Sequence, residues 1–475
     1  MGTISAAFGL ISQGLEADQS ALSTVANNVA NANTTGYTRE TPNWQENTPV
    51  EIGGVSYGAG VTETGATSVR DRVLTERLDQ QQQLASASDT RLSSLNTIQA
   101  LFTPASGSTN STAGDIGSDI TGFFNSFSSL EANPGNNALR QQVLATANTL
   151  AGDVSSVAAS VNAQRAALDQ EASGVSIQVN SLTGSIAQLN LEIQSNSPNA
   201  DAGSLEDQRQ QDLSQLSKLI GVNQITTENN GLSITTTSGQ LLVSEGSSFS
   251  LTTGMVAGET HFYVGTTDVT AQLAGGGGQL GGLLTARDQD IPSVLSSLDQ
   301  LAYNISTNVN ALNNTGTDLY GATGTLGAPL YIFNEPAPGA VAGSAANLSV
   351  TMTEPNQISA AGLGEGAGDN TNAIAMANLA NQTIVNGQTP INYYSNFVAT
   401  LGSTVSSVQT ENTALNASVT QLQTQNDALS SVNLNDEAAS MQQLERSYQA
   451  ASQVFAILNT IMASVLNLGE QTTVS

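Results

Sequence analysis

The chain has 475 residues and no cysteine, with a single lysine and a single histidine. Without cysteine it can form no disulfide, no thiol nucleophile and no zinc site of the cysteine type. Ten arginines and the one lysine stand against 39 acidic residues, a net charge of −28. Nucleic-acid binders need a basic surface to displace counterions from phosphates. We therefore expect no nucleic-acid partner, and an anionic membrane surface is equally disfavoured.

Long apolar runs are also missing. The most apolar stretch, 454–468, is interrupted by four Asn, Thr and Ser residues, so it does not predict a membrane span. The first basic residue is Arg39, which leaves no positive region in front of a short apolar core. A cleaved signal peptide is therefore not expected, and export would use another route.

Aromatic residues make up only 4% of the chain, so burial must rest on aliphatic seams. An interior proline costs a helix about 3 kcal/mol, and proline is absent before Pro42, between 135 and 197, and after Pro390. These three windows carry the pattern of long helices. The fold class predicted is mainly α with β insertions.

Both chain ends show heptad seams, in which apolar residues recur at steps of three and four. Only Asp18 interrupts the N-terminal seam. Neither helix can bury such a seam alone, so we expect residues 1–30 to pair with 435–468 as a coiled coil that packs against neighbouring subunits. The residues expected at this assembly interface are Ile4, Phe8, Ile11, Leu15, Leu22, Val25, Asn27, Asn28, Val29, Tyr448, Phe455, Leu458, Ile461, Met462 and Val465.

Two further seams run through 150–193 and 401–429, the second with Asn412 and Asn426 on it. Buried asparagines at such positions fix helix register. Shorter helices are predicted at 70–102, 119–131, 204–220 and 283–312, and Ser204 with Asp207 matches a capping box at the start of the third of these.

Between the helices lie two β-like blocks. Residues 222–270 alternate short apolar runs with turn signals at 229–231 and 238–239, which predicts a small antiparallel sheet. Residues 320–370 are rich in Gly, Ala and Pro, with weak strands near 330–333 and 348–352. Both blocks read as excursions from one helical body.

Residues 54–58 match the G-x-S-x-G pattern of hydrolases, with Ser56 as nucleophile and His261 as the histidine of a triad. That pattern requires a strand-to-helix turn directly after the serine. Here Gly60 and an alternating segment follow instead. A hairpin turn is the favoured interpretation, and no catalytic residue is assigned.

Gly276, Gly278 and Gly281 match the glycine fingerprint of dinucleotide sites, with Asp299 at the spacing of a ribose ligand. No parallel βαβ pattern surrounds them, so they are better explained as a flexible connection into the helix at 283. Scattered carboxylates and one histidine build no metal site. The sequence assigns no cofactor and no metal.

The most specific segment runs from Asn27 to Arg39, where an apolar helix ends in Asn, Thr and Gly. It resembles the N-terminal signature of the axial proteins of the bacterial flagellum, the rod, hook and hook-associated proteins. Residues 432–437, followed by 448–450 and 466–468, resemble the C-terminal signature of the same family. In the middle, 216–222 and 281–288 are similar to the hook-associated members rather than to rod or hook proteins.

The resemblance implies a structural protein without enzymatic activity that joins the hook to the filament by helical self-assembly. Its implied partners are further copies of itself in a ring, the hook protein, and a second junction protein or flagellin. It also implies a flagellar export chaperone at the C-terminal helix. The implied location is extracellular, in the flagellum.

On this basis we predict four domains: a terminal coiled-coil domain (1–38 and 432–475), a helical bundle domain (39–221, 276–319 and 371–431), a small β domain (222–275) and a β excursion (320–370). An alternative function stays open, that of a flagellin-like or other secreted filament or tip protein that binds a surface. Flagellin resembles this plan but lacks the two terminal signatures.

Overall fold

The computed structural model describes residues 2–52, 54–102, 115–197, 201–325 and 327–471. The chain forms two compact units, each built from segments far apart in sequence. Unit 1 contains residues 1–83, 178–251 and 416–475, and unit 2 contains 84–177 and 252–415. No described helix is long and apolar enough to cross a membrane.

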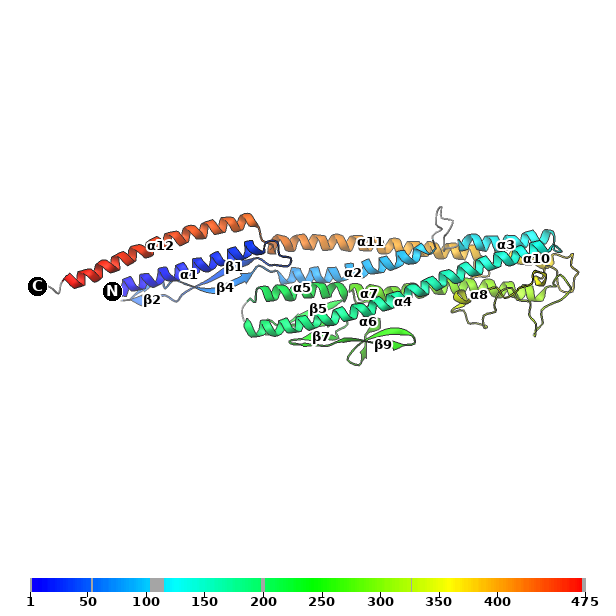
Figure 1. The fold of residues 1–475 in the computed structure, drawn as a ribbon, viewed down its shortest axis with the longest axis horizontal. Helices are drawn as coiled ribbons and strands as arrows, with labels where there is room; N and C mark the ends of the chain where they lie inside the picture. The colour runs from blue at the N-terminus through cyan, green and yellow to red at the C-terminus, as the bar shows by residue number, and fades with distance from the viewer. Residues whose placement is uncertain (1, 53, 103–114, 198–200, 326, 472–475) are drawn as a thin grey trace. The chain divides into compact units, whose positions relative to one another are not determined.

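Helices dominate both units, which confirms the predicted fold class (Figure 1). The long ones coincide with the proline-free windows and the predicted shorter segments. They are α1 (Gly2–Asn31), α2 (Arg72–Ala100), α3 (Ile116–Ala132), α4 (Asn137–Asn196), α5 (Ser204–Leu219), α8 (Ile291–Thr315), α11 (Pro390–Ser430) and α12 (Leu434–Gln471). The short ones are α6 (Thr270–Ala274), α7 (Gly278–Thr285), α9 (Ser344–Asn347) and α10 (Thr371–Asn378).

The predicted sheet between 222 and 270 is present as two antiparallel sheets. In unit 1 four strands pair in chain order: β5 (Val222–Thr226), β6 (Leu232–Thr236), β7 (Leu241–Ser244) and β8 (Ser247–Ser248). The other sheet consists of β9 (Leu251–Val256), β10 (Glu259–Val264) and β11 (Thr267–Asp268). Both predicted turn signals lie between strands, where Asn229, Asn230 and Gly239 have positive φ.

Residues 40–68, which the domain prediction placed in the helical bundle, form four strands in unit 1. They are β1 (Glu40–Glu46), β2 (Val50–Ile52), β3 (Val55–Tyr57) and β4 (Val61–Ser68). β1 pairs with β4, and β2 pairs with β3 in the hairpin predicted around Gly54, whose φ is +81°. A bulge between Asn43 and Trp44 shifts the β1–β4 register. The four-domain division otherwise stays a prediction.

The aromatic residues are few but concentrated in unit 2. Phe123 lies 5.2–5.5 Å, centroid to centroid, from Phe124, Phe127 and Phe333, and all four rings are buried. Because Phe333 comes from the irregular block, this cluster ties residues 320–370 to α3. A core of this kind was not expected from a composition with so few aromatics.

Strands were expected within 320–370, but among its described residues only isolated bridges form, one of them between Phe333 and Val350. Buried asparagines of α8 hold the backbone in place of a sheet. Asn310 donates to the Phe333 carbonyl at 2.9 Å and accepts from the Phe333 N–H at 3.0 Å. Asn313 likewise accepts from the Ser359 N–H at 2.9 Å. Side-chain amides therefore satisfy backbone groups that would otherwise be left unpaired.

The helix predicted at 283–312 contains a π-helical turn, Ala286–Asp290, between α7 and α8. Arg287 in that turn is 1% exposed and donates to the Asp169 carboxylate at 2.5 Å and to the Thr260 carbonyl at 2.8 Å. Just before it, α7 crosses α2 so closely that a Cβ on Gly282 would lie 2.4 Å from the Ala87 carbonyl oxygen. Gly282 therefore serves helix packing.

We predict that Gly282→Ala destabilises unit 2, because the added methyl group forces α7 away from the backbone of α2. Overpacking of this kind costs about 1–3 kcal/mol, and the melting temperature should fall by several degrees in far-UV circular dichroism. Gly275→Ala is the control, since a Cβ there meets nothing within 4 Å. Equal melting temperatures for the two variants would contradict the packing argument.

Candidate assembly surface

The terminal helices α1 and α12 lie side by side and antiparallel in unit 1 (Figure 1). Near the free ends the rings of Phe8 and Phe455 pack against each other at a tilt of 52°, with centroids 4.3 Å apart, and near the other end Asn28 donates to Glu437. Eight predicted interface residues are half-buried on this pair: Ile4, Phe8, Ile11, Leu15, Leu22, Phe455, Leu458 and Met462. The predicted pairing of the two ends is therefore confirmed.

A second apolar stripe on α12 remains exposed. We define the outer face of α12 as Val454, Ile457, Ile461 and Val465, which are 39–58% exposed. These residues follow one another at steps of three and four, so they share one side of the helix. Ile461 and Val465, predicted as seam residues, thus lie on the outer face rather than on the seam with α1.

The remaining predicted interface residues lie in the second half of α1, except Tyr448 on α12. Val25 is buried at 4% exposure and Asn28 at 1%. Asn27, Val29 and Tyr448 are exposed. Whether any of the predicted residues contacts another subunit stays a prediction.

On another side α1 is covered by β1 and β4. Asn47 donates to the Gln13 side chain at 3.2 Å, and Ser20 donates to the Glu63 carboxylate. The paired strands β1 and β4 therefore hold α1 on one side, while α12 covers another side. This leaves the outer face of α12 as the apolar stripe of the pair that has no cover among the described residues.

Asn28 is the centre of a buried polar cluster that we call the anchor, formed by Asn28, Tyr37, Arg39, Glu40 and Glu437. The Asn28 amide donates to the Glu40 carbonyl at 2.8 Å and to the Glu437 carboxylate at 3.2 Å. Its oxygen accepts from the Glu40 N–H at 2.9 Å and from the Tyr37 hydroxyl at 2.8 Å. All four hydrogen-bonding positions of the side chain are used.

The anchor joins the two signature segments. Arg39 pairs with Glu437, Nε to Oε1, at 2.6 Å, and the Arg39 N–H donates to the Ser430 carbonyl at 2.8 Å. Glu437 is 1% exposed, so this arginine and the Asn28 amide replace water as hydrogen-bond partners of its carboxylate. A buried charge that loses its partners is strongly destabilising. The buried Glu437 of the C-terminal signature therefore needs Asn28 and Arg39 of the N-terminal signature as partners.

The start of α5 extends the polar network behind the anchor. Asp207 accepts from the Thr38 N–H at 3.0 Å and from the Thr38 hydroxyl at 2.7 Å, and it pairs with Arg70. The predicted capping box of Ser204 and Asp207 is wrong: the N-cap residue is Gly203, and no side chain caps the helix. The Asp207 carboxylate is instead committed to the signature segment.

Burial sets the electrostatics of this region. It raises the pKa of Tyr37 to about 12, with the Glu40, Asp207 and Glu437 carboxylates adding to the effect. Burial also raises the pKa of Glu40. Tyr37 is thus held neutral at physiological pH, as its role as donor to Asn28 requires.

Beside the anchor, a cavity of about 470 Å³ is lined by the signature loop, α2, α5 and the end of α11. On its wall Asp79 is 1% exposed and accepts from Gln210 at 2.9 Å and from Gln224 at 3.0 Å. Burial raises the pKa of Asp79 to about 6 despite these hydrogen bonds. Lys218, the only lysine, is an exposed residue lining the same cavity.

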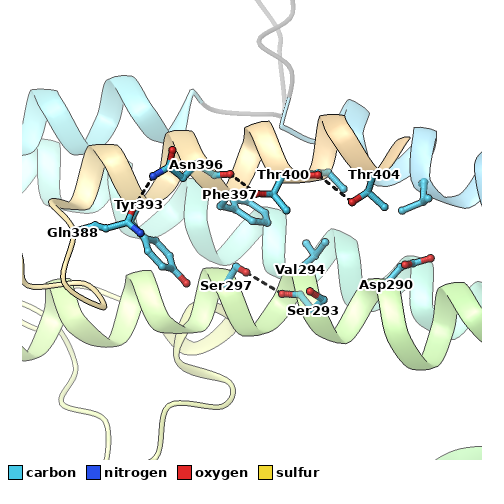
Figure 2. Close-up of a pocket in the computed structure, with 12 residues that line it drawn as sticks. Asp290, Ser293, Val294, Ser297, Gln388, Tyr393, Asn396, Phe397, Thr400 and Thr404 are labelled. Atoms are coloured by element: carbon cyan, nitrogen blue, oxygen red, sulfur yellow. Dashed lines mark hydrogen bonds between the residues drawn. The ribbon is translucent and has the colours of Figure 1, made fainter. Parts of the chain in front are cut away.

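Unit 2 has a separate groove of about 260 Å³ between α8 and α11 (Figure 2). Figure 2 shows Ser293 and Ser297 on α8 facing Thr400 and Thr404 on α11. Its one carboxylate, Asp290, is neutralised by Arg91 through hydrogen bonds of 2.8 and 2.9 Å. The groove offers hydroxyl and amide groups but no histidine or cysteine, and no predicted interface residue lines it.

The residues weighed for chemistry have structural partners. Ser56 lies within strand β3 rather than at a strand-to-helix turn. His261 bonds Asp268 at 2.7 Å, and the Thr270 hydroxyl and N–H, together with His261, lower the pKa of Asp268 to about 2.

Asp299, proposed at the spacing of a ribose ligand, accepts the N–H groups of Gly343 and Ala345 at 2.8 Å each. It therefore holds the turn that begins α9. In the described residues no three His, Asp or Glu side chains converge as a metal site would require.

Sequence reasoning missed the charged half of the anchor. Arg39 and Glu437 stood inside the quoted signatures but were not predicted as site residues. The sequence did hold a signal for this ion pair, because the N-terminal signature ends in a positive charge and the first segment of the C-terminal signature, 432–437, ends in a negative one. Arg70, Glu206 and Asp207, which support the anchor, carried no such signal because their partners are about 130 or more residues away.

We predict that Asn28→Ala loosens α12, because it removes four hydrogen bonds and leaves the Glu437 carboxylate with Arg39 alone. The expected cost is about 2–4 kcal/mol. Hydrogen exchange of the α12 amides should speed up accordingly. Asn33→Ala is the matched control, since Asn33 is exposed and makes none of the hydrogen bonds of the anchor. Unchanged exchange in Asn28→Ala would refute the role given to the anchor.

Asp79 predicts a pH dependence of stability. The folded state holds its proton more tightly than the unfolded chain, so this contribution is fully present below pH 3.8 and is lost as the pH rises through about 6. Asp79→Asn should therefore stabilise the protein at pH 7 by about 2–3 kcal/mol, with little difference from the parent below pH 4. Urea unfolding at both pH values measures this. Glu51→Gln, at an exposed position on β2, should have no effect at either pH.

Comparison with known proteins agrees with the resemblance of the terminal segments. The family profile described as "Flagellar hook-associated protein FlgK helical domain" matches residues 105–330. A second profile, "Flagella basal body rod protein", matches residues 12–38, which include Asn28 and Tyr37.

Curated relatives match nearly the whole chain. "Flagellar hook-associated protein 1" of Salmonella typhimurium is 25% identical over 552 aligned positions, which cover 96% of this chain and 98% of the relative. The protein of the same name from Bacillus subtilis is 26% identical, covering 95% of this chain and 96% of the relative. The Escherichia coli protein is 25% identical, with 96% and 98% covered.

A solved structure described as the flagellar hook junction protein FlgK from Burkholderia pseudomallei superposes with a TM-score of 0.63. It covers 74% of this chain and 99% of that one, at 17% identity, so the likeness concerns the fold. Together, the profiles and the curated relatives show that the chain is similar to flagellar hook-associated protein 1 over nearly its whole length, with residues 105–330 matching the helical-domain profile of that family.

Proposed function

We propose that the chain is a structural adapter that joins the flagellar hook to the filament. The observation that carries this proposal is the anchor: two signature segments from opposite ends of the chain meet at Asn28, Arg39 and Glu437 and hold α1 and α12 together. Relatives over nearly the full length are named for association with the hook, and the solved relative for the hook junction.

Self-assembly follows from the exposed outer face of α12. A stripe of four large aliphatic residues on a helix is a surface that gains free energy when covered. Because the faces of the terminal pair differ, identical copies would meet through heterologous contacts, which generate rings or helices. The partners proposed are neighbouring copies in a ring, the hook protein at one end, and a second junction protein or flagellin at the other.

We further propose that the four predicted domains take different positions in the assembly. The terminal coiled-coil domain (1–38 and 432–475) lines the inner part of the assembly. The helical bundle domain forms the next layer, and the β domain (222–275) and the excursion (320–370) face solvent. No catalytic role is proposed, since Ser56 and His261 have the structural placements described above.

Export is proposed to use the flagellar secretion route. Before assembly the outer face of α12 would favour aggregation, and a chaperone that covers an amphipathic helix would prevent it. We therefore propose that a flagellar export chaperone binds the C-terminal helix. Loss of co-elution on deleting residues 440–475 would support this, and unchanged binding would move the site elsewhere.

The adapter role predicts that a strain lacking the gene keeps its hooks and loses its filaments. Complementation with Ile461→Asp should fail to restore filaments, since a carboxylate on the outer face costs several kcal/mol on burial in the assembly. The Ile461→Asp monomer should melt like the parent, because Ile461 is exposed within the single chain. Electron microscopy of complemented cells and thermal unfolding are the two measurements.

Two further variants sharpen the test. Leu458→Asp changes the half-buried face toward α1, so it should also loosen α12 in the monomer, as hydrogen exchange would show. Met255→Asp alters an equally apolar but exposed residue of β9 and should restore filaments. If Ile461→Asp cells grow normal filaments, the outer face is not an assembly surface.

A further inference from the structure

The cations of this chain are almost all committed to internal contacts. Eight of the ten arginines donate to carboxylates, amides or carbonyls of the same chain: Arg39, Arg70, Arg72, Arg91, Arg140, Arg165, Arg209 and Arg287. In the described part of the chain, the side chains of Arg77, Lys218 and Arg446 have neither an ion pair nor a hydrogen bond. In a chain of net charge −28, an unpaired cation is a scarce group.

Arg446 is the only basic residue of α1 and α12. It is exposed and lies eleven residues before Ile457. At 3.6 residues per turn, eleven residues make about three turns, so Arg446 falls on the same side of the helix as Ile457. The outer face of α12 therefore begins with one positive charge and continues as an aliphatic stripe.

The exposed side of α1 is complementary to the outer face of α12 in charge and in side-chain size. We define the outer face of α1 as Ser5, Gly9, Glu16 and Ser23, four exposed residues at helical steps of four and seven. Its one charge is Glu16, which has no hydrogen-bond or ion-pair partner in the described residues. Its other residues are small.

Gly9 adds an observation of its own. It sits within the helix, where glycine is less stable than alanine. A Cβ there would meet nothing within 4 Å, so the packing of the single chain does not require a glycine. A glycine tolerated at this position fits the close approach of another helix.

We infer that the outer face of α12 in one copy docks antiparallel on the outer face of α1 in a second copy, with Arg446 paired to Glu16. This inference rests on the proposed assembly function and names the surface that performs it. In that register Ile457 lies opposite Ser5, and Val454 lies beside Gly9, so large aliphatic side chains meet small residues. Charge and side-chain size both match.

The contact is heterologous, because each copy offers two different faces. One copy presents its α12 to a neighbour and receives the α12 of another on its α1, so the contact repeats around a ring. The register also pairs the one cation of the terminal helices with a carboxylate. Without that pairing, neighbouring acidic helices would repel one another.

A charge exchange tests the ion pair in the full-length chain. In a strain lacking the gene, Arg446→Glu should reduce the number of filaments per cell about tenfold or more, because like charges then face each other. Glu16→Arg should do the same, and the double variant should restore filaments. Arg77→Glu, at a cation on α2 that also lacks an ion pair, is the control and should behave like the parent.

Cross-linking tests the register, and the absence of cysteine removes any background. Two tagged chains of different size, one with Ser5→Cys and one with Ile457→Cys, are produced together. Oxidation of isolated hooks with their junctions should join one chain to the other. The pair Ser5→Cys and Met255→Cys should not cross-link.

The outcomes separate this inference from the proposed function. Wild-type complementation that restores filaments, with a double charge variant that does not, overturns the inference and leaves the adapter function intact. Cross-linking of Ile457→Cys to hook protein or flagellin instead of to a second copy also overturns it. Normal filaments in the strain without the gene overturn the adapter function itself.

Discussion

The architecture of unit 1 depends on keeping one carboxylate buried. The Glu437 side chain is buried, and Arg39 and the Asn28 amide take the place of water around its carboxylate, while Asn28 also fixes the first residue of β1. One set of hydrogen bonds thus positions three features: the pairing of α1 with α12, the start of β1 and the end of α11. A purely apolar seam could slide along its heptads, whereas this cluster permits one register.

Much of the fold could be predicted from local pattern. Absence of proline and heptad spacing located α1, α4, α11 and α12, because those signals act over a few residues. Apart from the hairpin at 54–58, the strands in 40–68 were not predicted, since β1 and β4 are largely exposed and both contact α1, which lies outside their own local pattern. Asp207 shows the limit most clearly: its local motif predicted a cap, but a partner 169 residues away claimed its carboxylate.

The same contrast separates the apolar and polar parts of the candidate surface. The outer face and the inner face of α12 both satisfy a helical period, so periodicity alone could not say which one α1 covers. The contact between the Phe8 and Phe455 rings shows which face α1 covers, and Ile461 lies on the exposed face. In unit 2, asparagine side chains such as that of Asn310 bond backbone groups that strand pairing would otherwise satisfy. Such contacts follow no period in the sequence, so the pattern could not predict them.

Lys218 offers a site for selective chemical labelling. It is the only lysine in 475 residues, it is exposed, and it lines the cavity beside the signature loop. Amine chemistry can therefore address one side chain, besides the α-amino group, without any engineering. A fluorophore attached there would sit next to the segment that joins the two chain ends, where its emission would report whether that joint is closed.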